Sequence, residues 1–134
     1  MKKFICILLV AFLNCNSINA AEFRWSEIVT NDKKNTTFYL DRKTIFKVGN
    51  YQYYWMLSDY IIPFEDTHST LTHNVVNCRT FENKIITYTA YSKRMGKGEV
   101  QLDFIVAEDV PNMSKWEFFS EKTSHGFVLK KICK

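Results

Sequence analysis

Residues 51–62 read YQYYWMLSDYII, and this stretch decides the fold class. Its large side chains fall into two alternating sets, Tyr53, Trp55 and Leu57 against Tyr54, Met56 and Tyr60. Alternation with a period of two residues is typical of a β-strand. Because both sets are aromatic, the pattern predicts a central strand with both faces covered. Pro63 follows, and since proline has no N–H to donate to a neighbouring strand, we expect the strand to end there.

The same alternation recurs on both sides of this strand. It predicts further strands over residues 23–30, 36–41, 69–80, 84–92 and 99–107. Gly49 and Asn50 have the composition of a hairpin turn. The chain contains no repeat, no low-complexity stretch and no linker rich in proline and glycine. We therefore expect one domain, built on a single antiparallel sheet of about six strands.

The last residues change from strand-like to helix-like patterning. Thr123 or Ser124 is suited to cap the start of a short helix. Its apolar stripe is formed by Leu129, Ile132 and Cys133. Gly126 costs such a helix about 1 kcal/mol relative to alanine. The predicted fold class is therefore α+β and mainly β, with a short C-terminal helix.

The start of the chain has the pattern of a signal peptide. Two lysines precede an apolar run over residues 4–13, which is too short to span a bilayer as a helix. Ala20 and Ala21 are the candidate cleavage positions, and we favour Ala20. We therefore expect residues 1–20 to be removed and residues 21–134 to form an exported domain without a transmembrane segment.

A lipid anchor on Cys15 is the alternative way for the chain to be processed. A lipid-modified cysteine needs small residues directly before it. Here Phe12, Leu13 and Asn14 precede it, and these residues are large or polar. We therefore expect that Cys15 is not lipidated.

Two of the four cysteines lie in the segment that we expect to be removed, which leaves Cys78 and Cys133. The compartment of an exported protein is oxidising, so two remaining cysteines most simply form one disulfide. The alternative is a metal site completed by His73 or His125, but the spacing of the cysteines matches no zinc motif.

The charge of the chain argues against a nucleic-acid partner. The sequence has 18 basic and 14 acidic side chains, and removing two lysines with the signal peptide leaves 16 basic and 14 acidic, a net charge of +2. A nucleic-acid-binding domain has a concentrated basic face instead. The sequence also lacks a nucleophile motif such as G-x-S-x-G. We therefore predict a protein without a catalytic site, metal or cofactor.

An ordered series of residues runs through most of the chain after the signal peptide. The series is Trp25, Tyr39-Leu40-Asp41, Ile45, Gly49, Trp55-Met56-Leu57-Ser58-Asp59-Tyr60, Cys78, Tyr91, Met95-Gly96-Lys97-Gly98, Trp116 and Cys133. With this series the chain resembles the surface-adhesin protein E-like family of Gram-negative bacteria. The resemblance implies an antiparallel sheet on which the disulfide holds a C-terminal helix.

The same resemblance implies a non-enzymatic protein, exported to the periplasm or the cell surface, that contacts extracellular or envelope proteins. It also leaves a homodimer open. The second hypothesis is a soluble periplasmic protein that binds or inhibits another envelope protein, as small disulfide-bonded lysozyme inhibitors do.

Two groups of residues are candidates for a protein-binding surface. Aromatic residues make up 16% of the chain, and outward-facing tyrosines offer rigid contact area at low entropic cost. The candidates are the tyrosines Tyr51, Tyr54 and Tyr60 and a basic tip formed by Lys93, Arg94 and Lys97.

Overall fold

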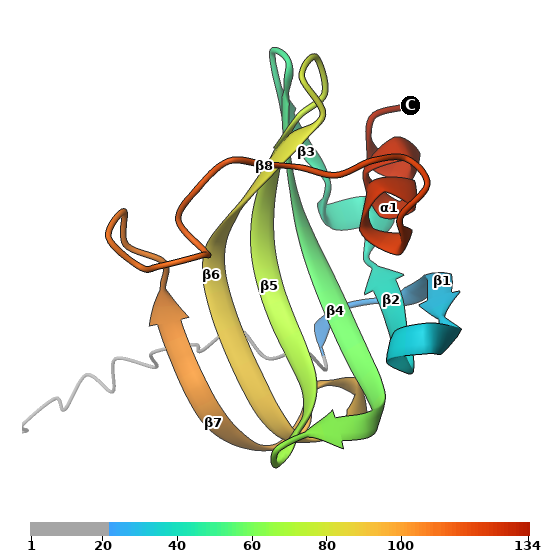
Figure 1. Cartoon of the computed structure of the whole chain (residues 1–134), viewed down its shortest axis with the longest axis vertical. Helices are drawn as coiled ribbons and strands as arrows, with labels where there is room; N and C mark the ends of the chain where they lie inside the picture. The colour runs from blue at the N-terminus through green and yellow to red at the C-terminus, as the bar shows by residue number, and fades with distance from the viewer. Residues whose placement is uncertain (1–21) are drawn as a thin grey trace, which may run out of the picture.

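The computed structural model describes residues 22–134, which form an antiparallel sheet curved around one short helix (Figure 1). The strands are β1 (Ser26–Asn31), β2 (Thr36–Leu40), β3 (Phe46–Val48), β4 (Tyr51–Phe64), β5 (Thr67–Asn77), β6 (Glu82–Lys93), β7 (Lys97–Ile105) and β8 (Glu117–Phe118). The helix is α1 (Ser124–Ile132), and three short 3-10 turns are η2 (Asp32–Lys34), η3 (Arg42–Thr44) and η4 (Arg94–Gly96). The predicted signal peptide, with Ala20, Ala21 and Cys15, lies outside the described residues.

The main path of the sheet runs in the order β1-β2-β4-β5-β6-β7. These six strands are the predicted ones, and the predicted fold class is confirmed. β3 and β8 are additional short strands that pair with β4 and β6. Three and two residues, respectively, are too few to show a period-two pattern, which is why the sequence did not predict them.

β4 lies in the interior of the sheet, between β2 and β3 on one side and β5 on the other. The prediction that Pro63 ends this strand is wrong, because β4 continues to Phe64. The register between β4 and β5 shifts after Asp59 and resumes at Phe64. Pro63 therefore falls within an irregular stretch, where its missing N–H leaves no ladder bond unmade.

One face of the sheet carries α1, and we call it the helix face. Its core is formed by Leu40, Tyr54, Met56, Val76, Val128, Leu129 and Ile132. The three helical members are at most 3% exposed, so α1 is held mainly by its apolar stripe. Burying each of these side chains contributes roughly 1.5–3 kcal/mol. A helix of nine residues is marginal in isolation, so this packing is needed for α1 to form.

The opposite face of the sheet is covered by the segment that precedes β1. The ring of Phe23 stacks on Trp25 at 4.8 Å and lies 5.4 Å from Trp55 of β4. Trp55 stacks in turn on His73 of β5 at 4.4 Å. The expectation that β4 is covered on both faces is therefore confirmed.

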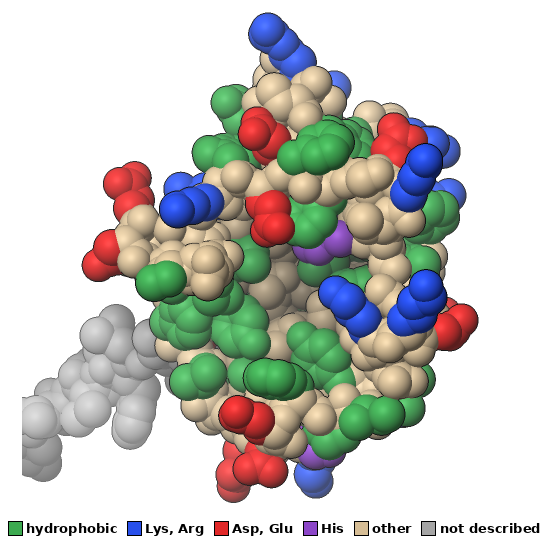
Figure 2. Space-filling model, viewed as in Figure 1, with side chains coloured by type: hydrophobic (Ala, Val, Ile, Leu, Met, Phe, Trp, Pro, Cys, Tyr) green, Lys and Arg blue, Asp and Glu red, His purple; other side chains and the backbone are tan. Residues whose placement is uncertain are grey.

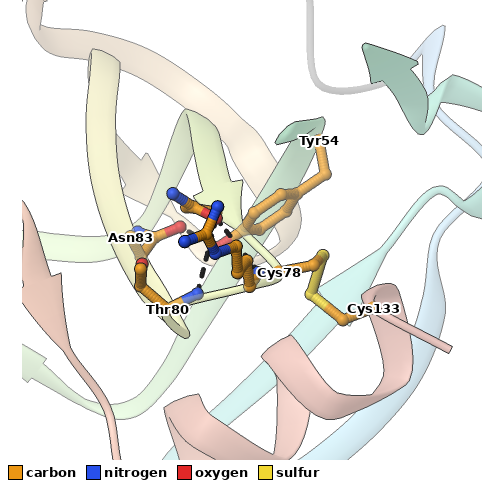
Figure 3. Close-up of a disulfide and its surroundings, with 7 residues drawn as sticks. Tyr54, Cys78, Thr80, Asn83 and Cys133 are labelled. Atoms are coloured by element: carbon orange, nitrogen blue, oxygen red, sulfur yellow. Dashed lines mark hydrogen bonds between the residues drawn. A yellow bond between two sulfur atoms is a disulfide. The ribbon is translucent and has the colours of Figure 1, made fainter. Parts of the chain in front are cut away.

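The disulfide joins Cys78 to Cys133, with their Cα atoms 5.4 Å apart (Figure 3). Cys78 follows the last residue of β5, in the turn toward β6, and Cys133 follows the last residue of α1. The bond closes a separation of 55 residues and attaches the C-terminal end of α1 to the sheet. The metal-site alternative for these two cysteines is thereby excluded, since both thiols are used.

Gly126 is required by packing, although the sequence predicts only a cost to the helix. A Cβ at this position would collide with the carbonyl group of Ser120 in the segment that leads into α1. Thr123 caps the helix by accepting a 3.0 Å hydrogen bond from the Gly126 N–H. The glycine thus lets the chain fold back tightly against the first turn of α1. Within residues 22–134, no helix has the length and apolarity needed to cross a membrane.

Candidate functional site

A hollow on the helix face, beside α1, is the main candidate for a binding site (Figure 2). It has a volume of about 420 Å³ and lies between the β1–β2 turn, the end of β4 and the middle of β6. The residues that matter for its chemistry are Lys34, Tyr60, Ile62, Phe64, Thr67 and Tyr88. The hollow therefore has a mainly apolar and aromatic lining, with polar groups at its edge.

Tyr60 and Tyr88 provide the aromatic lining of the hollow. The Tyr60 hydroxyl lies 3.0 Å from Thr70 Oγ1, a hydrogen-bonding distance that fixes the ring. The Tyr88 ring packs against Phe104 of β7 at 5.5 Å. Burial, followed by the neighbouring Tyr60, raises the pKa of Tyr88 above its ordinary value. Tyr88 therefore remains an uncharged hydroxyl at neutral pH and suits an apolar or neutral ligand group.

The edge of the hollow carries exposed apolar side chains. Ile62 is 64% exposed, Phe64 is 74% exposed and Leu102 of β7 is 55% exposed. Leu102 lies next to the hollow, because it pairs with Ala90, two residues along from the pair that Phe104 forms with Tyr88. We call Ile62, Phe64 and Leu102 the apolar strip. A cluster of this kind on a small domain is typical of an interaction surface.

Hydrogen bonds join β7, which carries Leu102, to the residues that directly follow Phe64. Thr67 Oγ1 donates to Gln101 Oε1 at 3.0 Å, and Gln101 Nε2 donates to the Asp66 carbonyl at 3.1 Å. These bonds tie the β4–β5 turn to β7, although the two segments are 34 and 35 residues apart in the sequence. The apolar strip is thus held as one surface.

The predicted basic tip lies at η4, where β6 turns into β7. Lys93 and Lys97 are exposed. Arg94 is committed to an ion pair, since its Nε donates to Asp59 Oδ2 at 2.8 Å. The tip therefore presents two exposed lysines and one arginine that is paired with Asp59.

Two fully buried polar residues hold the η4 turn in place. Asp59 is 0% exposed and accepts a 2.7 Å bond from the Met95 N–H in addition to the Arg94 pair. Ser69 is also 0% exposed; its hydroxyl donates to the Lys93 carbonyl at 2.6 Å and accepts from the Gly96 N–H at 2.9 Å. Two stretches of the ordered series quoted above thus meet in this turn, since Asp59 of the first bonds to Met95 of the second.

Replacing Asp59 with alanine is expected to lower the free energy of unfolding by about 2 kcal/mol. The change leaves the Met95 N–H and the Arg94 guanidinium without their acceptor. Arg94 is half-exposed and can turn to water, so the loss stays below that of a fully buried ion pair. Urea denaturation measures the effect, with Asp103→Ala as the control, since Asp103 is exposed and accepts one bond from Thr89. Equal losses in the two variants would contradict this role of Asp59.

The expectation that Tyr54 faces outward is wrong. Tyr54 is 0% exposed, and its hydroxyl donates to Asn83 Oδ1 at 2.7 Å (Figure 3). Asn83 in turn donates to Asn74 Oδ1 at 3.3 Å. Burial raises the pKa of Tyr54 far above its ordinary value, so the hydroxyl stays protonated. The side chain lies beneath α1 and belongs to the core.

The other two predicted tyrosines lie apart from each other. Tyr60 lines the hollow, whereas Tyr51 is 41% exposed and its ring lies 5.9 Å from that of Trp116. Tyr88, Ile62, Phe64 and Leu102 were not predicted as site residues. The unbroken apolar run Ile61-Ile62-Pro63-Phe64 is the signal that could have indicated them, since such a run is longer than one face of a strand needs.

The histidines of the described chain do not converge on one site. His68 bonds to the Asp66 carbonyl in the β4–β5 turn, and His73 stacks on Trp55 on the opposite face of the sheet. His125 stacks on Phe119 at 4.0 Å, beside the start of α1. Among residues 22–134, no three histidine, cysteine or acidic side chains are grouped so that they could hold a metal ion.

Comparison with known proteins gives one family and one set of structures. The profile of the family described as Surface-adhesin protein E matches residues 25–134. A solved structure of Haemophilus influenzae protein E is similar, with 16% identity and a TM-score of 0.54 over 81% of this chain and 83% of that chain. A second crystal form gives the same identity and TM-score over 82% and 88%. At this identity the structural likeness establishes a shared fold. No protein of curated function matches the sequence.

Proposed function

Since the chain belongs to the surface-adhesin protein E family, we propose that it is an exported, non-enzymatic protein that binds an extracellular or envelope protein. The observation that carries this proposal is the apolar strip at the edge of the hollow. Exposing large apolar side chains to water is unfavourable, and a partner that covers them gains that free energy.

The shape of the site indicates how a protein would bind. The hollow can receive one or two apolar side chains of a partner, while Ile62 and Phe64 contact the surface around them. A volume of about 420 Å³ is suited to this kind of insertion. Lys34 and Thr67 at the edge can bond to the polar backbone of the inserted segment.

Replacing both Ile62 and Phe64 with serine is expected to weaken partner binding by roughly a hundredfold or more, because two buried apolar contacts are lost. The measurement is biolayer interferometry of residues 21–134 against a panel of purified extracellular-matrix proteins and envelope proteins. The matched control is Phe46→Ser with Val48→Ser, which removes two exposed apolar residues of β3 away from the hollow.

A partner that binds the double variant as tightly as the original protein would refute the role of the strip. The same assay tests the remaining predicted positions one at a time. Tyr60 lies in the hollow, whereas Tyr51, Lys93 and Lys97 lie elsewhere. Of these four, we therefore expect substitutions of Tyr60 alone to weaken partner binding as the Ile62 and Phe64 double variant does.

We place the protein at the cell surface, in keeping with its family. Protease treatment of intact cells distinguishes this location from the periplasm, because a surface protein is degraded and a periplasmic one is spared. The periplasmic outcome would favour a protein that binds another envelope protein instead.

A homodimer is the form of assembly that the sheet favours. Within residues 22–134, β7 pairs only with β6, and Val100, Leu102 and Ile105 along it are more than half exposed. A second copy that pairs with the free edge of β7 would satisfy its backbone groups and cover these side chains. Light scattering after size exclusion gives the mass that decides between monomer and dimer.

A further inference from the structure

A second cavity lies between the β1–β2 turn and the start of α1, next to the hollow. Its volume is about 510 Å³. Every side chain that lines it is polar or charged, in contrast to the apolar hollow, and Lys34 is shared by the two. In Figure 2 basic side chains stand on the right of the view, where η2 and α1 approach each other in Figure 1.

Three lysines converge on this cavity from two distant parts of the sequence. Lys33 and Lys34 come from η2, and Lys122 comes from the segment before α1. All three are exposed. Within residues 22–134 the ion pairs formed are Arg94 with Asp59 and Lys130 with Glu121, so none of these three lysines is neutralised in that way.

The electrostatics of the cavity therefore favour an anion. Three like charges around one cavity repel each other, and their summed field attracts a negatively charged group. Asp32 is the one carboxylate that the described part of the chain places in the wall, and it reduces this field without cancelling it.

We propose that this cavity binds the sulfate or phosphate groups of an anionic sugar chain. The volume lies in the range of about 300–1,000 Å³ that small-molecule sites occupy, so it has room for sugar rings as well as for the anionic group. Asn31 and Ser124 in the wall offer amide and hydroxyl groups that suit sugar hydroxyls.

The composition of the wall selects this ligand over a nucleic acid. Single-stranded nucleic acids are bound by aromatic rings that stack on the bases. Among the described residues, no aromatic side chain lines this cavity. Lysine ammonium groups act as point charges, which match a sulfate or phosphate without demanding the planar geometry that arginine prefers.

The test is isothermal titration of residues 21–134 with three probes. These are a heparin-derived hexasaccharide, the same hexasaccharide without sulfate groups, and a delipidated lipopolysaccharide core oligosaccharide that carries phosphate groups. We expect one of the two anionic probes to bind at least roughly tenfold more tightly than the desulfated probe. The tighter of the two identifies the source of the anion. The logarithm of Kd should rise with the logarithm of salt concentration with a slope of about 2, for three engaged cations.

Variants locate the binding in this cavity. The triple variant Lys33→Gln, Lys34→Gln, Lys122→Gln should weaken binding of the anionic probe by roughly tenfold or more. The control removes the same charge at exposed positions elsewhere, with Lys43→Gln, Lys47→Gln and Lys115→Gln, and should change Kd by less than about threefold.

Asp32→Asn provides a test of opposite sign. Removing this carboxylate should tighten binding of the anionic probe by roughly threefold, because the field of the lysines is no longer reduced. Because Asp32→Asn is a single substitution, its binding measurement decides the proposal even where the triple variant fails to fold. Equal binding of the sulfated and desulfated probes, equal losses in the two triple variants, or weaker binding by Asp32→Asn would overturn the proposal.

Discussion

Replacing Cys78 and Cys133 together with serine will lower the free energy of unfolding by about 4 kcal/mol. The bond closes a separation of 55 residues, and a cross-link of this span removes that much chain entropy from the unfolded state. Such a loss is a large share of the roughly 5–15 kcal/mol that stabilises a domain of this size. Guanidinium denaturation of the original and double-variant proteins measures the difference.

The two single variants provide the control for this result. Cys78→Ser and Cys133→Ser should each cost nearly as much as the double variant, because either change removes the same bond. Adding a reducing agent should bring the original protein close to the double variant. A loss below about 1 kcal/mol in the double variant would show that packing alone holds α1 on the sheet.

Acid will destabilise the protein through His125. Burial lowers the pKa of this side chain to about 4, from an ordinary value of 6.5. The ring is enclosed by Phe119 at 4.0 Å and Phe38 at 6.2 Å, and its buried Nε2 has no hydrogen-bond partner within the described structure. The neutral form is therefore the one that fits between these rings.

The direction of the pH effect follows from the lowered pKa. Between pH 6.5 and 4 the unfolded chain binds a proton at this histidine and the folded chain does not, so stability falls as the pH falls. The full loss, reached below pH 4, is about 3 kcal/mol. We expect it to act first on the start of α1, because the disulfide holds only the other end of the helix.

The His125→Phe variant isolates this contribution from that of other groups. Phenylalanine keeps an aromatic ring next to Phe119 but cannot bind a proton. The stability difference between the original protein and the variant should therefore change by about 3 kcal/mol between pH 7 and pH 4. The matched control is His68→Gln, which removes a half-buried histidine at the start of β5. A His125→Phe curve that runs parallel to that of the original protein would show that His125 does not titrate in this way.

The strands could be predicted because their evidence is local. The alternation over residues 51–62 reports that the segment is extended, whatever it packs against. The pairing of Cys78 with Cys133 could be predicted because only two cysteines remain once the predicted signal peptide is set aside. These inferences need no knowledge of how distant segments meet.

The binding surface could not be predicted in the same way. Both faces of β4 carry aromatic residues, so the sequence does not say which face α1 covers along the length of the strand. α1 buries Tyr54 but leaves Tyr60, six residues further along the same face, in the hollow. The packing role of Gly126 could not be predicted for the same reason. Ser120 lies close to this glycine because of the path by which the chain enters the helix.

The location of the disulfide also sets an order of events while the chain is being made. Synthesis proceeds from the N-terminus, so Cys78 emerges 55 residues before Cys133. During that interval its thiol is unpaired next to a hairpin that can already form. A thiol oxidase that meets the growing chain can therefore hold it as a mixed disulfide at position 78, and the arrival of position 133 releases the enzyme by exchange.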